Sequence, residues 1–321
     1  MPPLSPSSPA TACAEPLSRP CRGTTWRVRG AAAILATLDA DGRLDGVPVM
    51  PEMLGWLGSC VTISHRAEKV CIDGAPEGVR QFRGNDVVFL KDTRCDGSAH
   101  GGCGRACLLF WKEAWLANPS EPVAPDSPAD VEALRARLQT RQPDGRALCQ
   151  STEILTATTP LSRIGRLRVI LRELRVGNRG VLEMLRLVWF PVAGKLLQPF
   201  TPRYVASDRD TTPTESLGLQ PGDWVQVKSL EEIRATLDRE GRNRGLQFSR
   251  DLAVHCGRRY RVRNRVESLI VEVTGRQMTP RNTVILEGVH CPCRYVVGGC
   301  PRADLIYWRE VWLRRVDGPG T

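Results

Sequence analysis

Short alternations of hydrophobic and polar residues recur along the chain, and the clearest lies near residue 224. Residues 224–228 place Trp224, Gln226 and Lys228 on one face of an extended strand and two valines on the other. Ser229 follows at once, with Glu232 three residues later, which is the pattern of a capping box. The sequence therefore predicts a strand at 224–228 and a short helix at 229–238.

The same pattern occurs once before, near the start of the chain. Residues 25–28 predict a strand, residues 31–39 a short helix, and residues 40–42 a turn. Counting aligns the two copies at an offset of 199 residues in the first block and 197 in the last. The matched pairs include Gly42 with Gly241, Arg66 with Arg265, Trp111 with Trp308, and Trp115 with Trp312. We interpret this self-similarity as a tandem duplication of roughly 90 residues.

Each copy predicts a small barrel. In the second copy, residues 259–273 predict a strand pair, 284–289 a strand and 306–316 a closing strand, in addition to the strand at 224–228. Four or five short strands with one early helix suit an SH3-like, partly open barrel. The predicted fold is mainly β with α: two tandem SH3-like partly open barrels joined by a helical connector.

A Trp-x-Glu-x-Trp motif closes both copies. On a strand, Trp111, Glu113 and Trp115 would point the same way, as would their counterparts in the second copy. Such a face could hold a peptide or a sugar. We favour packing of the tryptophans against the central helices, with the glutamate paired to an arginine.

Residues between the copies predict three helices, at 128–140, 162–176 and 180–197, after a proline-rich linker at 117–127. The third is the most apolar run, but charged residues and a proline interrupt it, so it does not predict a membrane span. The predicted divisions are a disordered N-terminus at 1–22, a first repeat at 23–116, a linker and helical connector at 117–215, and a second repeat at 216–321.

The net positive charge of the chain suggests an anionic partner. The 321 residues carry a formal net charge of +10, which raises the question of an anionic membrane surface or nucleic acid. Packing of a connector between two barrels explains the same pattern, and we favour this interpretation; an unknown protein partner is expected in either case. The arginines in question are Arg163, Arg166, Arg168, Arg172 and Arg175.

Cysteine is abundant, with twelve residues, and six of them lie in two clusters. Clustering favours metal binding over a distributed disulfide framework. The first residues lack the basic start and apolar core of a signal peptide, so we expect a cytoplasmic protein whose thiols stay reduced.

The first cluster has the spacing C-x23-C-x7-C-x3-C and comprises Cys71, Cys95, Cys103 and Cys107, with His100 as a substitute ligand. Glycines in this loop permit the tight turns that folding around an ion requires. Four thiolates suit structural zinc and equally suit an iron-sulfur cluster. Reduced, partly buried cysteines without metal are the alternative.

The second copy keeps part of this cluster. Ile270 and Asp304 replace Cys71 and Cys107, while Cys300 matches Cys103. The loss of two thiols together fits loss of a metal site, although drift in unbound cysteines would look similar. A modified second site would use His290, Cys291, Cys293 and Cys300.

Five phrases resemble those of a family of bacterial proteins with duplicated, cysteine-containing SH3-like barrels. They are GRLDGVPVMPEM at 42–53, RCDGSAHGGC with LLFWKEAWL at 94–116, and GRNRGLQF at 241–248 with YWREVWL at 307–313. The resemblance implies architecture and no mechanism. No catalytic triad order, phosphate loop or nucleotide fingerprint occurs. We therefore expect a metal-binding scaffold without assigned catalysis, or alternatively a thiol redox protein or a binder of membranes or nucleic acid.

Overall fold

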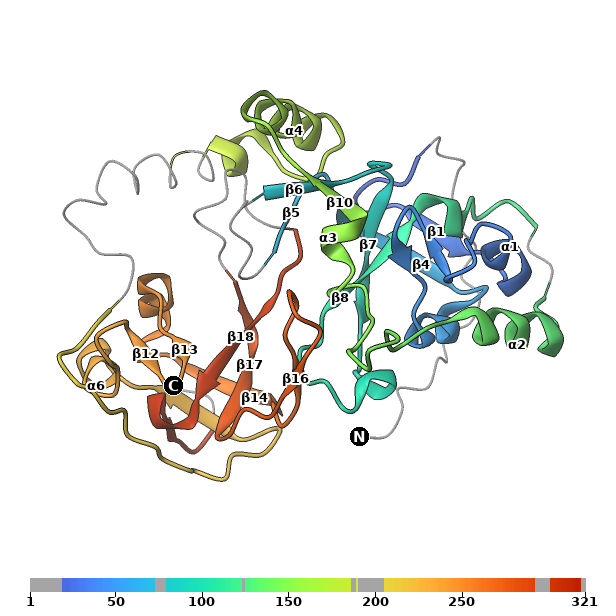
Figure 1. The fold of residues 1–321 in the computed structure, drawn as a ribbon. Helices are drawn as coiled ribbons and strands as arrows, with labels where there is room; N and C mark the ends of the chain where they lie inside the picture. The colour runs from blue at the N-terminus through green and yellow to red at the C-terminus, as the bar shows by residue number, and fades with distance from the viewer. Residues whose placement is uncertain are drawn as a thin grey trace.

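The computed structural model describes residues 19–72, 79–122, 125–185, 189, 205–291 and 301–318. Within these ranges the chain is mainly β with short helices, and it forms two five-stranded antiparallel sheets (Figure 1). This confirms the predicted class and is consistent with two tandem barrel domains.

The first sheet has the strand order β8-β7-β4-β1-β9. Buried and half-exposed positions alternate along β1, as expected for a strand with one face on the core. The strands are β1 (Thr25–Val28), β4 (Cys60–Arg66), β7 (Val87–Arg94), β8 (Leu108–Lys112) and β9 (Leu116–Ala117). Around them lie α1 (Ala31–Leu35), β2 (Arg43–Leu44), β3 (Val47–Pro48), η1 (Pro51–Trp56), β5 (Val70–Cys71), β6 (Val79–Phe82), η2 (Ser98–His100) and η3 (Glu113–Trp115).

The second sheet has the matching order β18-β17-β14-β11-β19. Its strands are β11 (Trp224–Val227), β14 (Arg259–Arg265), β17 (Thr283–His290), β18 (Leu305–Arg309) and β19 (Leu313–Arg315). The other elements are α6 (Leu230–Arg234), β12 (Arg242–Asn243), β13 (Leu246–Gln247), η4 (Arg250–His255), β15 (Leu269–Ile270), β16 (Gln277–Met278) and η5 (Glu310–Trp312). The order of the strands in this sheet and their spacing along the chain match those of the first sheet. The repeat in the sequence is therefore also a repeat in the structure.

The Trp-x-Glu-x-Trp motif departs from the prediction. It does not lie on one strand, because a 3-10 turn begins at Glu113 in the first repeat and at Glu310 in the second. The tryptophans of both motifs are fully buried. As we favoured, each glutamate pairs with an arginine: Glu113 with Arg66, and Glu310 with Arg265. Nearly every residue of the two motifs is buried. The alternation of hydrophobic and polar residues that marks a strand is therefore missing, and the sequence pattern could not locate the turn.

The residues between the repeats contain α2 (Pro128–Arg137), α3 (Ile154–Ala157), β10 (Thr158–Pro160) and α4 (Arg163–Arg175). Helices α2 and α4 fall where the sequence predicts them, each beginning after a serine cap, Ser127 or Ser162. The predicted helix at 180–197 lies largely outside the described residues. Strand β10 was not predicted, and it pairs with β6 of the first repeat.

The repeats contact each other through equivalent loops. His65 Nε2 donates to the carbonyl of Pro301 across 2.6 Å. The counterpart of His65 is Asn264, whose side-chain amide donates to the carbonyl of Gly104, itself the counterpart of Pro301. This reciprocity gives the repeats an approximate twofold relation. Arg105 of the first repeat adds an ion pair of 3.1 Å with Glu272 of the second, and the buried Glu272 also pairs with Arg302 of its own repeat at 2.6 Å.

Candidate metal centre

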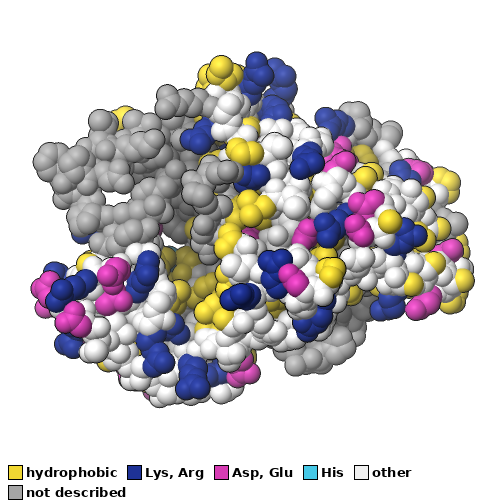
Figure 2. All heavy atoms as spheres, viewed as in Figure 1, with side chains coloured by type: hydrophobic (Ala, Val, Ile, Leu, Met, Phe, Trp, Pro, Cys, Tyr) yellow, Lys and Arg dark blue, Asp and Glu magenta, His cyan; other side chains and the backbone are white. Residues whose placement is uncertain are grey.

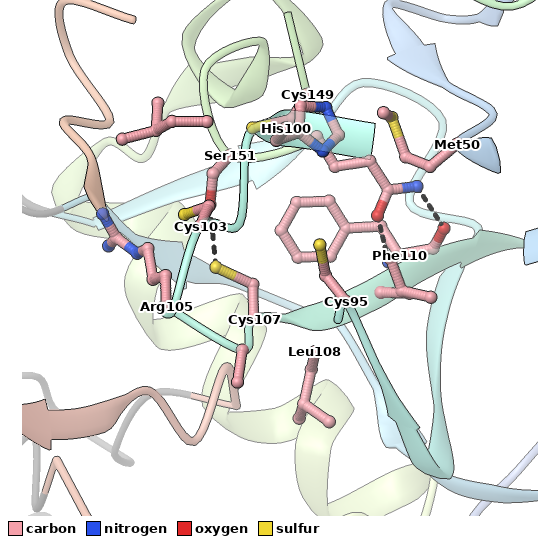
Figure 3. Close-up of a pocket in the computed structure, with 14 residues that line it drawn as sticks. Met50, Cys95, His100, Cys103, Arg105, Cys107, Leu108, Phe110, Cys149 and Ser151 are labelled. Carbon is pink, nitrogen blue, oxygen red and sulfur yellow. Dashed lines mark hydrogen bonds between the residues drawn. The ribbon is translucent and has the colours of Figure 1, made fainter. Parts of the chain in front are cut away.

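A small buried cavity lies behind the cysteine-rich loop of the first repeat (Figure 3). Its volume is about 30 Å³, which is room for one or two water molecules or a single ion. Four cysteines line it, together with His100, Gln150 and Ser151. The cysteines are Cys95, Cys103, Cys107 and Cys149, and each carries a free thiol.

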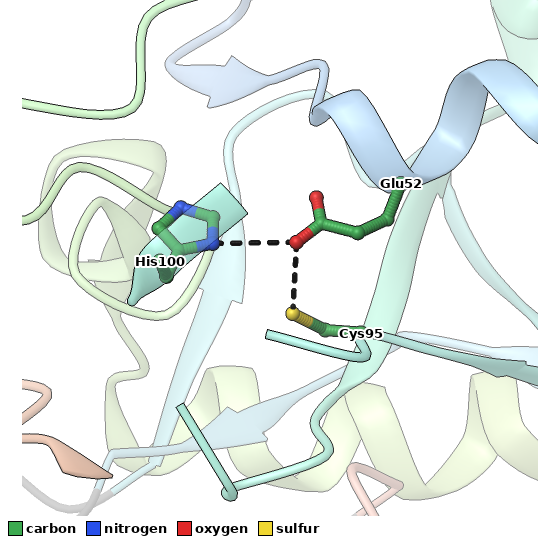
Figure 4. A group of neighbouring side chains, drawn as sticks. All are labelled: Glu52, Cys95 and His100. Atoms are coloured by element: carbon green, nitrogen blue, oxygen red, sulfur yellow. Dashed lines mark hydrogen bonds and ion pairs between the residues drawn. The ribbon is translucent and has the colours of Figure 1, made fainter. Parts of the chain in front are cut away.

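Three potential metal ligands converge beside this cavity (Figure 4). The carboxylate of Glu52, the sulfur of Cys95 and a ring nitrogen of His100 lie within 4.8 Å of one another. Glu52 Oε1 is 3.3 Å from His100 Nδ1 and 3.4 Å from Cys95 Sγ. Tetrahedral zinc with ordinary bond lengths places such nitrogen–oxygen and sulfur–oxygen pairs about 3.3 and about 3.5 Å apart. The three side chains therefore lie at coordination spacing.

Local structure explains how the three residues meet. Cys95 follows the end of β7, and the chain then turns through Gly97 into η2, whose last residue is His100. Gly97 has a φ of +75°, and a Cβ there would lie 2.1 Å from the carbonyl oxygen of Cys103. A side chain at this position would push the loop apart. Glu52 arrives from η1, which begins at Pro51.

The tautomer of His100 is set by its second nitrogen. Nε2 lies 3.0 Å from the carbonyl oxygen of Leu148. A carbonyl oxygen can only accept a hydrogen bond, so Nε2 must carry the hydrogen that is donated. The proton of the neutral ring is therefore on Nε2, and the Nδ1 lone pair faces Glu52. Burial alone would lower the pKa of His100, but the hydrogen bond and charge of Glu52 outweigh it and raise the pKa. The pocket thus offers the ring nitrogen to a cation, either a proton or a metal ion.

Glu52 has unused coordination capacity. Its side chain is 4% exposed, and Oε2 has no hydrogen-bond partner among the described residues. A buried carboxylate oxygen without a partner is costly. An ion bound between the three side chains would remove that cost.

The structure does not bring the four predicted thiols to one point. Among the described residues, no three of the sulfurs of Cys71, Cys95, Cys103 and Cys107 lie within 4.8 Å of one another. Cys103 and Cys107 line the cavity, whereas Cys71 does not. Cys71 ends β5, and its carbonyl accepts a hydrogen bond from Arg302 at 2.9 Å. His100, proposed as a substitute ligand, is instead a member of the central group.

Two site residues were not predicted from the sequence. Glu52 lies within the phrase at 42–53, and its counterpart in the second copy, Asp251, is also acidic, which was a usable signal. Cys149 comes from the segment between the repeats and has no counterpart to draw attention to it. Burial raises the pKa of Cys149 to about 11, so its thiol is protonated at neutral pH.

The second repeat keeps only part of the group. Asp251 and Cys291 stand at the positions of Glu52 and Cys95, but the sequence has Val297 in place of His100. Of the predicted second site, His290 ends β17 and Cys291 follows it. Burial lowers the pKa of His290. Cys293 and Cys300 lie outside the described residues.

Comparison with known proteins gave no match: no family model, curated protein or solved structure is similar to this chain.

Proposed function

We propose that the protein is a metal-binding scaffold in which Glu52, Cys95 and His100 bind a single zinc ion. The observation that carries this proposal is the convergence of one oxygen, one sulfur and one nitrogen within 4.8 Å in a buried site. Zinc binds this combination of donors in proteins. The hydrogen bond from His100 to Leu148 is the outer contact that orients a metal-binding histidine.

A single ion suits the site better than an iron-sulfur cluster. The cavity of about 30 Å³ accommodates an ion with a water molecule, and a cluster of several iron and sulfide atoms needs much more space. The fourth zinc ligand would be a cavity thiol or a water molecule.

The role of the ion would be to fix a loop that joins the two repeats. The loop after Cys95 and His100 contacts the second repeat directly, because Gly104 N donates to Ser268 O across 2.8 Å. Gln277 Nε2 donates to Gly101 O across 3.1 Å. An ion tying this loop to Glu52 would hold both contacts in place. Free thiols suit the reducing environment of the cytoplasm, where we place the protein.

The binding role rests on the architecture. We propose that each sheet belongs to an SH3-like barrel, with the residues between the repeats as a largely helical connector. Two features support this: the outer strands β8 and β9 come from neighbouring segments, and a 3-10 turn stands just before β9. The same features recur around β19. Small barrels of this kind serve as binding modules.

Zinc analysis of purified variants tests the proposal. The wild type, purified under reducing conditions without chelator, should contain about one zinc per chain by elemental mass spectrometry. Glu52→Gln, Cys95→Ser and His100→Asn should each lose most of it. Cys71→Ser should keep it, which separates the three-residue site from the four-thiol prediction.

Cys256→Ser is the matched control, because Cys256 is also half-buried but lies in the second repeat. Its zinc content should equal that of the wild type. A zinc-free wild type, or zinc that disappears with Cys71→Ser and persists with His100→Asn, would refute the site.

A second candidate function rests on the exposed face of α4. Ile164, Leu167 and Leu171 follow one another at helical spacing and are 67%, 60% and 59% exposed. Arg166, Arg168 and Arg175 are exposed beside them. Figure 2 shows hydrophobic and basic side chains side by side where α4 lies. Such a surface suits association with an anionic membrane.

The opposite face of α4 anchors the helix to the first repeat. Glu173 is buried and pairs with Lys69 at 2.8 Å, and Arg172 pairs with Glu68 at 3.0 Å. The apolar face is therefore held outward. No helix among the described residues is both long and apolar enough to cross a membrane, so the contact would be peripheral.

Vesicle cosedimentation tests this second function. We expect binding to vesicles that contain phosphatidylglycerol, weaker binding in high salt, and its loss in the double variant Leu167→Glu/Leu171→Glu. Equal binding to neutral phosphatidylcholine vesicles, or none at low salt, would contradict it.

A further inference from the structure

The first repeat covers one of its grooves with its own chain. The segment 148–160 packs there, and Gln150 accepts a hydrogen bond from Phe110 N at 2.7 Å and donates one to Phe110 O at 2.8 Å. These bonds satisfy the outer edge of β8. Further along, β10 adds to the edge of β6, with Thr158 opposite Phe82. The segment thus covers the groove with the short helix α3 and the added strand β10.

Among the described residues, no segment covers the equivalent groove of the second repeat. Gly46 and Gly245 are counterparts with the same φ of +81°. A Cβ on Gly46 would lie 3.1 Å from Cα of Ala157 in the covering segment, whereas a Cβ on Gly245 would meet nothing within 4 Å. Among the described residues, no side chain takes the place of Gln150 at the backbone of Tyr307, the counterpart of Phe110.

The open groove has a volume of about 350 Å³. Its walls combine the β15–β16 hairpin with β18 and the turn between β12 and β13. Hydrophobic side chains line it, and two of them, Val273 and Met278, are 41% and 47% exposed. Figure 2 shows a hollow with hydrophobic side chains on the viewed face between the two repeats.

Charge differs between the two grooves. In the first repeat, the buried Lys112 is neutralised by Asp45 and Asp86, each 2.6 Å away. In the second, Arg309 stands in place of Lys112. Asp45 is replaced by Arg244, and Asp86 by Asn282. Within the described residues, neither Arg309 nor Arg244 forms an ion pair.

Arg309 lies at the floor of the groove and is 9% exposed. Its four hydrogen bonds go to three backbone carbonyls and the hydroxyl of Thr283. A guanidinium has five N–H donors, so one is left over. The charged residues lining the groove are Arg105, Arg244, Arg309 and Glu272, which is an excess of positive charge.

We propose that this groove binds an extended acidic peptide segment of a partner protein. The peptide would add to the edge of β16 as β10 adds to β6 in the first repeat. An aspartate or glutamate of the peptide would supply the carboxylate that Arg309 and Arg244 lack. Because a segment of polypeptide fills the equivalent groove, a peptide fits better than a nucleic acid. This inference is independent of the zinc site.

A peptide library tests the proposal on the full-length protein. Two displayed decapeptide libraries are random except at a central position, which is aspartate or glutamate in one and asparagine or glutamine in the other. The wild type should enrich the acidic library only. Peptides selected from it should bind at least about tenfold more weakly when their central acid is replaced by the amide.

Two variants place a carboxylate of the protein itself beside residue 309, where it would replace the carboxylate of the peptide. Arg244→Asp introduces it at an exposed position, and Arg244→Asp/Arg309→Lys restores the Asp45–Lys112 pair of the first repeat. Each should weaken binding of the selected peptides at least about tenfold. Arg259→Asp carries the same charge change on an exposed residue of β14 outside the groove, and should bind as the wild type does.

Three results would overturn the proposal. They are enrichment of neither library, binding that survives both Arg244 variants, and displacement of the selected peptides by a single-stranded oligonucleotide that binds more tightly than they do.

Discussion

The indole Nε1 of Trp115 donates a hydrogen bond to Thr37 Oγ1 across 3.1 Å. The same bond recurs in the second repeat, where Trp312 donates to Thr236 across 3.0 Å. Each threonine also donates to a carbonyl in its own helix. The 3-10 turn before the last strand is thus tied to the first helix identically in both copies.

Replacing either threonine should have a similar effect. Thr37→Val and Thr236→Val each leave a buried indole N–H without a partner, so we expect a loss of about 1–3 kcal/mol in the free energy of unfolding. Denaturant titration measures it. Thr274→Val, on the exposed side of a turn, should change stability by less than about 0.5 kcal/mol. Losses confined to one repeat would argue against equivalent roles.

Arg302 should couple the two repeats. From the second repeat it donates to Ser151 and to Cys71 O, so Arg302→Ala removes both bonds and one of the two arginines that pair with the buried Glu272, the other being Arg105. We expect a loss of about 1–3 kcal/mol and separate unfolding of the repeats in calorimetry. The control, Arg315→Ala, breaks an exposed pair with Asp223 and should cost at most about 1 kcal/mol. A single unchanged transition in Arg302→Ala would contradict the coupling.

Helix α6 should lose its cap in acid. The hydrogen bond from Ser229 N at 2.9 Å lowers the pKa of Glu232. The stabilisation is therefore complete above the ordinary carboxyl pKa and is lost as the pH falls through the lowered folded-state value. The melting temperature of the wild type should exceed that of Glu232→Gln at neutral pH, and the difference should shrink toward pH 3.

Gly46 and Gly245 form a matched pair for the filled and the open groove. Both have a φ of +81°, so alanine strains the backbone by about 1–2 kcal/mol at either position. At Gly46 the new methyl group also meets Ala157. Gly46→Ala should therefore lose clearly more stability than Gly245→Ala in denaturant titration. Equal losses would mean that segment 148–160 does not press on the first groove.

Much of the fold was accessible from local signals. The alternation at 224–228 and the Ser229–Glu232 capping box located β11 and α6 because both depend on neighbouring residues only. The offset between the copies anticipated the second sheet from the first. The 3-10 turns at Glu113 and Glu310 were missed, since burial on all sides removes the alternation that marks a strand.

The site was harder to predict because it depends on contacts between distant segments. Spacing grouped Cys95 with three other cysteines, but Glu52 comes from another element and completes the group. For the same reason, the sequence did not predict strand β10 or the contact of Gln150, because their partners lie in β6 and β8. Loss of cysteines in the second copy drew attention to the loop, while the proposed choice of ligands needed the three-dimensional structure.

The most direct test of the central claim is zinc X-ray absorption spectroscopy on the protein as purified. Coordination by Glu52, Cys95 and His100 predicts nitrogen and oxygen scatterers near ~2.0 Å and one or two sulfurs near ~2.3 Å. The histidine signature should vanish in any zinc retained by His100→Asn. A shell of four sulfurs, or protein that takes up no zinc, would contradict the account.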